Sequence, residues 1–91
     1  KVGVGNSFGP NSVICPNTIL GDHNIIYYNS TISHDVKIGL NNFIGPGAIL
    51  LGNSKIKKSN FFGANSILIQ NVNIKKNSQF FKAGLIIKKT Y

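Results

Sequence analysis

The sequence predicts an all-β solenoid, because its 91 residues repeat with a period of six. A large apolar residue stands at every sixth position, a small or medium-sized residue follows four positions later, and glycine often comes directly after the large residue. A helix repeats its apolar residues at spacings of three and four and a half-buried strand at two, so a sustained period of six fits neither. The apolar column is Val2, Phe8, Ile14, Leu20, Ile26, Ile32, Ile38, Ile44, Leu50, Ile56, Phe62, Leu68, Ile74, Phe80 and Ile86. The smaller residues are Asn6, Ser12, Thr18, Asn24, Ser30, Val36, Asn42, Ala48, Ser54, Asn60, Ser66, Val72, Ser78, Gly84 and Thr90.

This pattern resembles the hexapeptide repeat of the left-handed parallel β-helix, in which three hexads form one triangular coil of eighteen residues. The resemblance covers residues 1–91 without an insertion, which implies one domain of about five coils. Each side of a coil is expected to be a short strand that pairs with the neighbouring coils at ~4.8 Å, with the large residue inside the prism and the smaller one near the corner. Asparagine and glycine are expected at the corners, where positive φ occurs, and Pro10, Pro16 and Pro46 fall where a corner needs no hydrogen-bond donor.

Length and composition restrict the classes of function. A chain of this size buries only a modest fraction of its surface when it folds alone, so repetition or oligomerisation must contribute to its stability. Cys15 is the one cysteine, which rules out an intrachain disulfide and a cysteine-rich zinc cluster. The net charge of +8, carried by ten lysines and no arginine, favours an anionic partner such as phosphate, nucleic acid or a membrane surface.

The chain shows no sign of a membrane-spanning segment or of a signal peptide. No apolar run approaches the ~20 residues of a membrane span, and no charged segment leads into a hydrophobic one. We therefore expect a cytoplasmic protein with no membrane partner. Because the chain opens with Lys1 and not with methionine, we also expect it to be a piece of something longer.

A second apolar column occupies the last place of many hexads, which should face outward. Exposed apolar surface of this extent usually marks an interface. Prisms of the hexapeptide family associate as trimers around an axis parallel to the rod, so we expect a homotrimer; the alternative is that some of these residues only support the strands. The column contains Val13, Ile19, Ile25, Phe43, Ile49, Phe61, Ile67 and Leu85.

The segment I-S-H-D-V-K-I-G at 32–39 holds a histidine next to one of only two acidic residues. In the hexad frame His34 and Asp35 take the third and fourth places, at a corner outside the prism interior. Histidine exchanges protons near neutral pH, and an adjacent carboxylate can accept a hydrogen bond from one ring nitrogen and fix the tautomer. Gly52 stands eighteen residues further on, where a missing side chain would leave space for a reacting group and a backbone N–H could polarise a carbonyl oxygen.

The chain is similar to the sugar O- and N-acetyltransferases typified by the sialic acid O-acetyltransferases and by the acetyltransferase of diacetylbacillosamine synthesis. The matching segments are I-S-H-D-V-K-I-G at 32–39, I-G-P-G-A at 44–48, G-N-S-K-I at 52–56 and F-F-G-A-N-S at 61–66. The resemblance implies that His34 is the general base and that Asp35 adjusts the basicity of its ring. It also implies that acetyl-CoA, as co-substrate, lies in a groove between two prisms of the trimer.

The same resemblance assigns the lining of that groove. It places the backbone at Gly52, Ala64 and Lys82 along the acetyl-CoA groove, and it puts Phe43 where family members often carry a second histidine that contacts the cofactor, so that contact would be apolar. Relatives usually carry a preceding nucleotide-sugar-binding domain, which this sequence lacks, so the sugar acceptor is not determined.

The lysines of the C-terminal coils have two interpretations, whereas His23 and Cys15 are each given one. Lysines on the C-terminal coils fit the phosphates of coenzyme A, but a lysine-rich and asparagine-rich composition also keeps a rod soluble. We interpret His23 as a solvated corner residue and Cys15 as an ordinary wall residue. The lysines concerned are Lys57, Lys58, Lys75, Lys76, Lys82, Lys88 and Lys89.

The expected activity is therefore acetyl transfer from acetyl-CoA to a sugar amine or hydroxyl by direct attack, without a metal. A γ-type carbonic anhydrase shares the prism but needs three zinc-bound histidines, and the chain has only His23 and His34. Nucleic-acid binding has the charge in its favour but lacks a basic and aromatic platform or a groove-entering helix. A non-catalytic β-helix, serving as a trimerisation or binding scaffold, remains the alternative from another class.

Overall fold

The computed structural model of the protein describes residues 1–75 and 77–90. Within these residues the chain forms fourteen strands of two residues each and no helix, so no helix there is long and apolar enough to cross a membrane. The strands are β1 (Ser7–Phe8), β2 (Val13–Ile14), β3 (Ile19–Leu20), β4 (Ile25–Ile26), β5 (Thr31–Ile32), β6 (Lys37–Ile38), β7 (Phe43–Ile44), β8 (Ile49–Leu50), β9 (Lys55–Ile56), β10 (Phe61–Phe62), β11 (Ile67–Leu68), β12 (Asn73–Ile74), β13 (Gln79–Phe80) and β14 (Ile86–Ile87).

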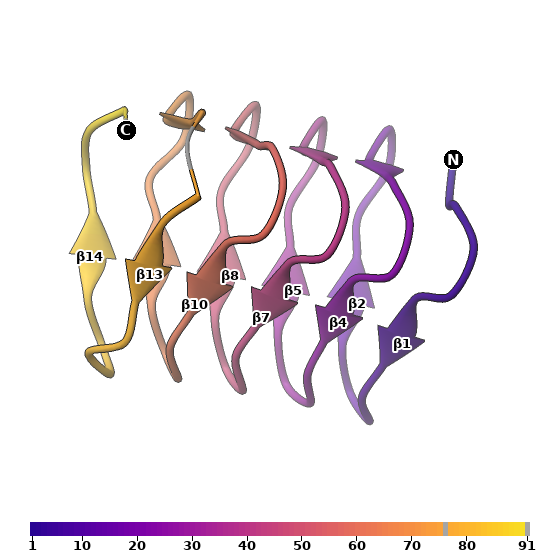
Figure 1. Ribbon diagram of the computed structural model, residues 1–91, viewed down its shortest axis with the longest axis horizontal. Coiled ribbons are helices and arrows are strands. Elements are labelled where there is room, and N and C mark those ends of the chain that lie inside the picture. The colour runs from indigo at the N-terminus through magenta and orange to yellow at the C-terminus, as the bar shows by residue number, and fades with distance from the viewer. Residues whose placement is uncertain (76, 91) are drawn as a thin grey trace.

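Three parallel sheets form the sides of a prism, and the coils stack as successive rings along it (Figure 1). The first sheet has the order β1-β4-β7-β10-β13, the second β14-β11-β8-β5-β2 and the third β12-β9-β6-β3. Each of the first four coils thus contributes one strand to each sheet, and the last coil contributes β13 and β14. The longest dimension, 27 Å, agrees with about five layers at a strand spacing of ~4.8 Å. The fold is the left-handed parallel β-helix that the hexad pattern predicts.

Most coils contain eighteen residues, whereas the last contains nineteen. Phe43 pairs with Phe61, eighteen residues later, but Ile67 pairs with Ile86, nineteen residues later. The expectation of a repeat without an insertion is therefore wrong at the corner between β13 and β14, where Gly84 adopts a φ of 70°. The extra residue shifts the inward position by one, so that Ile87 is 2% exposed and Ile86, which we expected inside, is 49% exposed.

The large residues of the hexads fill the prism, as predicted. The first coil differs because it has a neighbouring coil on one side only, which leaves Val2 and Phe8 55% and 46% exposed. Leu85, expected to face outward, is instead partly buried against the core because of the nineteen-residue coil. The buried apolar residues are Leu20, Ile26, Ile32, Val36, Ile38, Ile44, Ala48, Leu50, Ile56, Phe62, Leu68, Val72, Ile74, Phe80 and Ile87.

The corners turn through residues with positive φ, which confirms the role expected for asparagine and glycine. Asparagine and aspartate tolerate this conformation better than other residues with side chains. Asp35, with a φ of 58°, is one of the corner residues, so the backbone alone already favours an Asn or Asp at its position. The set is Gly5, Asn11, Asn17, His23, Asn29, Asp35, Asn41, Gly47, Asn53, Ser59, Asn65, Asn71 and Gly84.

A ladder of asparagines runs inside the corner between the third and first sheets. Asn24 Oδ1 accepts the backbone N–H of Asn42 at 2.9 Å, and Asn42 Oδ1 accepts that of Asn60 at 2.9 Å. The side-chain amides donate as well, for example Asn42 Nδ2 to Lys57 O at 2.9 Å. Asn24, Asn42 and Asn60 are at most 2% exposed, so these bonds satisfy polar groups that water does not reach.

Candidate functional site

The candidate site lies at the corner between the second and third sheets. His34 and Asp35 connect β5 to β6, and their side chains are 62% and 46% exposed. The structure therefore places both residues outside the prism interior, as the hexad frame predicts. The backbone of this corner is fixed by hydrogen bonds to the adjacent coils: Asp35 N–H donates to Pro16 O, and Asn53 N–H donates to His34 O.

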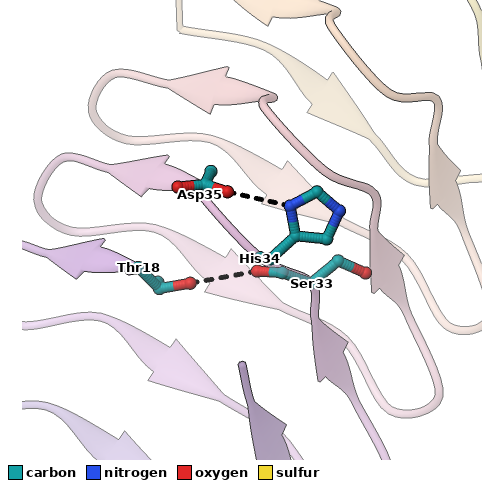
Figure 2. A network of polar contacts seen from close by, with 4 residues as sticks. All are labelled: Thr18, Ser33, His34 and Asp35. Atoms are coloured by element: carbon teal, nitrogen blue, oxygen red, sulfur yellow. Dashed lines mark hydrogen bonds and ion pairs between the residues drawn. The ribbon is translucent and has the colours of Figure 1, made fainter. Parts of the chain in front are cut away.

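His34 and Asp35 form the side-chain hydrogen bond that their adjacency suggests. His34 Nδ1 lies 2.9 Å from Asp35 Oδ2, and Thr18 Oγ1 donates to Ser33 O at 3.0 Å just before the histidine (Figure 2). An ionised carboxylate can only accept a hydrogen bond, so it selects the tautomer that carries its proton on Nδ1. Nε2 of the neutral ring then has a free lone pair, and no group in the described part of the chain donates to it. This arrangement suits a general base.

Gly52 lies directly against the imidazole, in the coil that follows. A Cβ built on Gly52 would stand 2.7 Å from both Cε1 and Nε2 of His34, which is closer than real Cβ contacts occur. The ring itself thus fills the space that we expected a reacting group to occupy, so that expectation is wrong. Gly52 N–H donates no hydrogen bond within the described residues, and Gly52 is buried against the ring.

The other predicted site residues lie elsewhere on the prism. Phe43 begins β7 in the first sheet, where its ring stacks on that of Phe61 at 4.7 Å. Ala64 and Lys82 lie at the corner between the first and second sheets. Within one chain, the structure thus brings Asp35 and Gly52 to His34 but leaves these three residues at other places. A groove lined by both groups requires two copies of the chain.

Analysis of the sequence missed a polar groove beside the histidine. It measures about 490 Å³ and follows the corner into the third sheet. Its side chains offer amides, ammonium groups and one carboxylate, which suit the hydroxyl groups of a carbohydrate. The signal was available, because stepping by eighteen from Asp35 reaches Asn17, Asn53 and Asn71. The full lining is Asn17, Asp35, Lys37, Asn53, Lys55, Asn71 and Asn73.

The remaining reactive side chains do not join this site. His23 is exposed at the corner between the third and first sheets, and Cys15 is a half-buried free thiol in the coil below His34. Across residues 1–75 and 77–90, no three His, Cys, Asp or Glu side chains come together as metal ligands would.

The site is thus defined by a small set of contacts. His34 is oriented by Asp35, its ring is seated on Gly52, and a polar groove opens beside it. Comparison of the chain with family models, with curated proteins and with solved structures found no match.

Proposed function

We propose that the protein is an acyltransferase that moves an acetyl group from acetyl-CoA to an amine or hydroxyl of a sugar. The observation that carries this proposal is the 2.9 Å contact between His34 Nδ1 and Asp35 Oδ2 at an exposed corner. It leaves Nε2 free to accept a proton. A groove whose side chains suit a carbohydrate lies on the Asp35 side of the same corner.

The residues of the corner support a direct-transfer mechanism. His34 Nε2 removes the proton from the acceptor O–H or N–H while the acceptor atom attacks the thioester carbonyl carbon. The negative charge that develops on the carbonyl oxygen needs a hydrogen-bond donor near the ring, and we assign this role to the backbone N–H of Gly52, which has no partner among the described residues. The C–S bond then breaks, and the imidazolium returns its proton to the departing thiolate. Asp35 accepts the hydrogen bond from Nδ1–H throughout, in the neutral ring and in the imidazolium.

A homotrimer fits this chemistry, because one chain does not bring all the expected lining together. A cyclic trimer needs two different patches on each copy, one for each neighbour. The outer positions of the first sheet include Ile25, Phe43 and Phe61, and those of the second include Ile49 and Ile67. Packing the first sheet of one copy toward the second sheet of the next would bring Phe43 toward the side of the prism that carries His34.

The assay is release of coenzyme A from acetyl-CoA in the presence of amino- or hydroxyl-bearing UDP-sugars or sialic acid. His34→Ala is expected to lower the rate at least about a hundredfold, the usual contribution of a general base. His23→Ala is the matched control, since it removes the other exposed histidine from a different corner, and it should leave the rate unchanged. An equal rate in His34→Ala and the unaltered protein would contradict the proposal.

A non-catalytic scaffold is the second candidate, favoured by the two apolar faces. Ile25 on the first sheet is 43% exposed, and Val13 and Ile86 on the second sheet are each 49% exposed. Exposed apolar faces of this kind are typical of protein–protein interfaces. A trimer that shows no acetyl transfer with any acceptor, together with an unchanged assembly in His34→Ala, would favour this scaffold role.

A further inference from the structure

The third sheet carries a lysine face, which we define by Lys37, Lys55, Lys57, Lys58 and Lys75. All five are exposed, and they are half of the ten lysines of the chain. Lys37 and Lys55 occupy outward positions of β6 and β9, and the other three lie at the corner that leads to the first sheet. The outward strand positions of the first and second sheets hold no lysine. The charge is therefore concentrated on one of the three sides of the prism.

This concentration is unfavourable for the folded chain alone. Lys37 and Lys55 are register partners on adjacent strands, and like charges directly opposite in a ladder destabilise a sheet. No carboxylate in the described part of the chain forms an ion pair with any lysine of this face. Asp35 is bonded to His34, and Asp22 accepts the N–H of Val4. Residues 1–75 and 77–90 thus supply no countercharge to this face, which points to an external anion.

The lysine face also contains exposed apolar surface. A shallow groove of about 480 Å³ runs between the lysines, and its floor is formed by Ile38, Gly39 and Ile56 together with Leu40. Leu40 is 42% exposed within this groove, and Ile19, on the same sheet, is 44% exposed. A partner that fits must offer anionic groups and apolar atoms on one flat surface.

In place of the expectation of no membrane partner, we propose that the lysine face docks the protein on an anionic phospholipid bilayer, with the long axis of the prism parallel to the membrane. Lipid phosphates would pair with the ammonium groups, and Leu40 would enter the boundary between headgroups and acyl chains. The sheet that carries the face spans about 14 Å across its four strands and has no projecting element, which suits a planar partner. The inference does not depend on acetyl transfer, and it gives Lys37 and Lys55, which also line the polar groove of the candidate site, a second, anionic ligand.

Nucleic acid is the competing polyanion, and the face fits it less well. Single strands are held by stacking of bases on aromatic side chains, and none of the described aromatic residues lies on the third sheet. Reading a duplex requires an element that enters a groove, which a flat sheet does not provide. The apolar residues between the lysines would contribute nothing to the binding of single-stranded or of double-stranded nucleic acid.

The test is co-sedimentation of the full chain with vesicles of phosphatidylcholine alone or of an equal mixture of phosphatidylcholine and phosphatidylglycerol. Binding is expected only to the anionic vesicles, and it should weaken as salt screens the charges. Each lysine near an anionic surface contributes about fivefold to partitioning, so Lys37→Gln with Lys55→Gln should lower the partition coefficient about 25-fold. Leu40→Ser should lower it without any change of charge.

Lys82→Gln with Lys88→Gln is the matched control, because both lysines are exposed and lie away from the third sheet. This pair removes the same net charge and should leave most of the vesicle binding intact. An equal loss in the two double variants would show that only net charge matters and would overturn the proposal. So would absence of binding to anionic vesicles, with or without binding to a short RNA used as a soluble polyanion. Circular dichroism checks that each variant keeps its β-structure.

Discussion

The imidazole of His34 rests on the backbone of Gly52 in the following coil, so closely that a Cβ at Gly52 would stand 2.7 Å from Nε2. Asp35 holds the other ring nitrogen at 2.9 Å. The ring is therefore held on two sides, by the Asp35 carboxylate in its own coil and by the backbone of Gly52 in the next coil. The absence of a side chain at Gly52 thus lets the ring pack on the backbone, and the ring fills the place that a Cβ would take.

Gly52→Ala should disturb the site without unfolding the protein. The three atoms nearest to the added methyl all belong to the exposed ring of His34, which can rotate away, so the free energy of unfolding should fall by less than about 1 kcal/mol. Rotation breaks the contact with Asp35, and acetyl transfer should decrease at least about tenfold. Thermal unfolding and the NMR signals of the ring measure the two effects. Gln70→Ala, in the next coil of the same column, is the control; unaltered ring signals in Gly52→Ala would contradict the packing.

Asp35→Asn should separate the chemical role of the carboxylate from its role in the corner. Asparagine tolerates the φ of 58° as aspartate does, so thermal stability should stay within about 0.5 kcal/mol. The amide no longer selects one tautomer of His34, and the rate of acetyl transfer should fall roughly tenfold or more. Asp35→Ala, by contrast, should also lose stability because alanine is strained at positive φ. If Asp35→Asn keeps full activity, the carboxylate serves the turn alone.

Asn42→Ala should be among the most destabilising single substitutions. Asn42 is 2% exposed, its Oδ1 accepts the N–H of Asn60 at 2.9 Å, and its amide donates to Asn24 Oδ1 and to Lys57 O. Truncation leaves buried polar groups without partners and opens a cavity, so we expect a loss of about 2–4 kcal/mol in the free energy of unfolding. Denaturant titration measures it. A cost below that of an exposed substitution such as Gln70→Ala would show that the ladder is not needed.

The eighteen-residue coil, the column of inward-facing apolar residues and the corner position of His34 could all be predicted from the sequence. Each of them depends only on the six-residue spacing. The nineteen-residue coil was missed because Ile86 and Ile87 are equally apolar and either could point inward. Only the positive φ of Gly84 and the resulting shift distinguish them. The packing of His34 on Gly52 was missed for another reason: spacing places a histidine next to a glycine, but the side-chain rotamer decides whether the space stays empty.

Ser54→Ala should stabilise the protein or leave it unchanged, which is unusual for a buried polar residue. Ser54 is fully buried and its Oγ has no hydrogen-bond partner among the described residues, while Val36 and Val72 occupy the equivalent places in the adjacent coils. Removing an unsatisfied hydroxyl should raise the free energy of unfolding by up to about 1 kcal/mol. Ser30→Ala is the matched comparison, because Ser30 Oγ donates a hydrogen bond to Tyr27 O at 2.8 Å. Loss of this bond should lower the free energy of unfolding by about 1–2 kcal/mol. Equal losses at both positions would mean that Ser54 has a partner in solution.

Light scattering should give the mass of a trimer for the unaltered chain, and two charge substitutions should show how its copies meet. Ile25 is on the outer side of the first sheet and Ile49 on that of the second. Lysine is tolerated at such positions, since Lys37 and Lys55 occupy them on the third sheet. Ile25→Lys and Ile49→Lys should therefore each fold and each become monomeric.

Mixing the two variants distinguishes a cyclic trimer from other assemblies. In a cyclic trimer the first sheet of one copy faces the second sheet of the next, so a mixture of Ile25→Lys and Ile49→Lys chains retains one intact contact and should form a one-to-one dimer that cannot close. If like sheets faced each other, every contact between the two variants would join an altered face to an unaltered one, so no one-to-one mixed pair would form and each variant would pair only with itself. A monomeric unaltered chain, or variants that keep the mass of a trimer, would remove the two-copy groove on which the placement of acetyl-CoA depends.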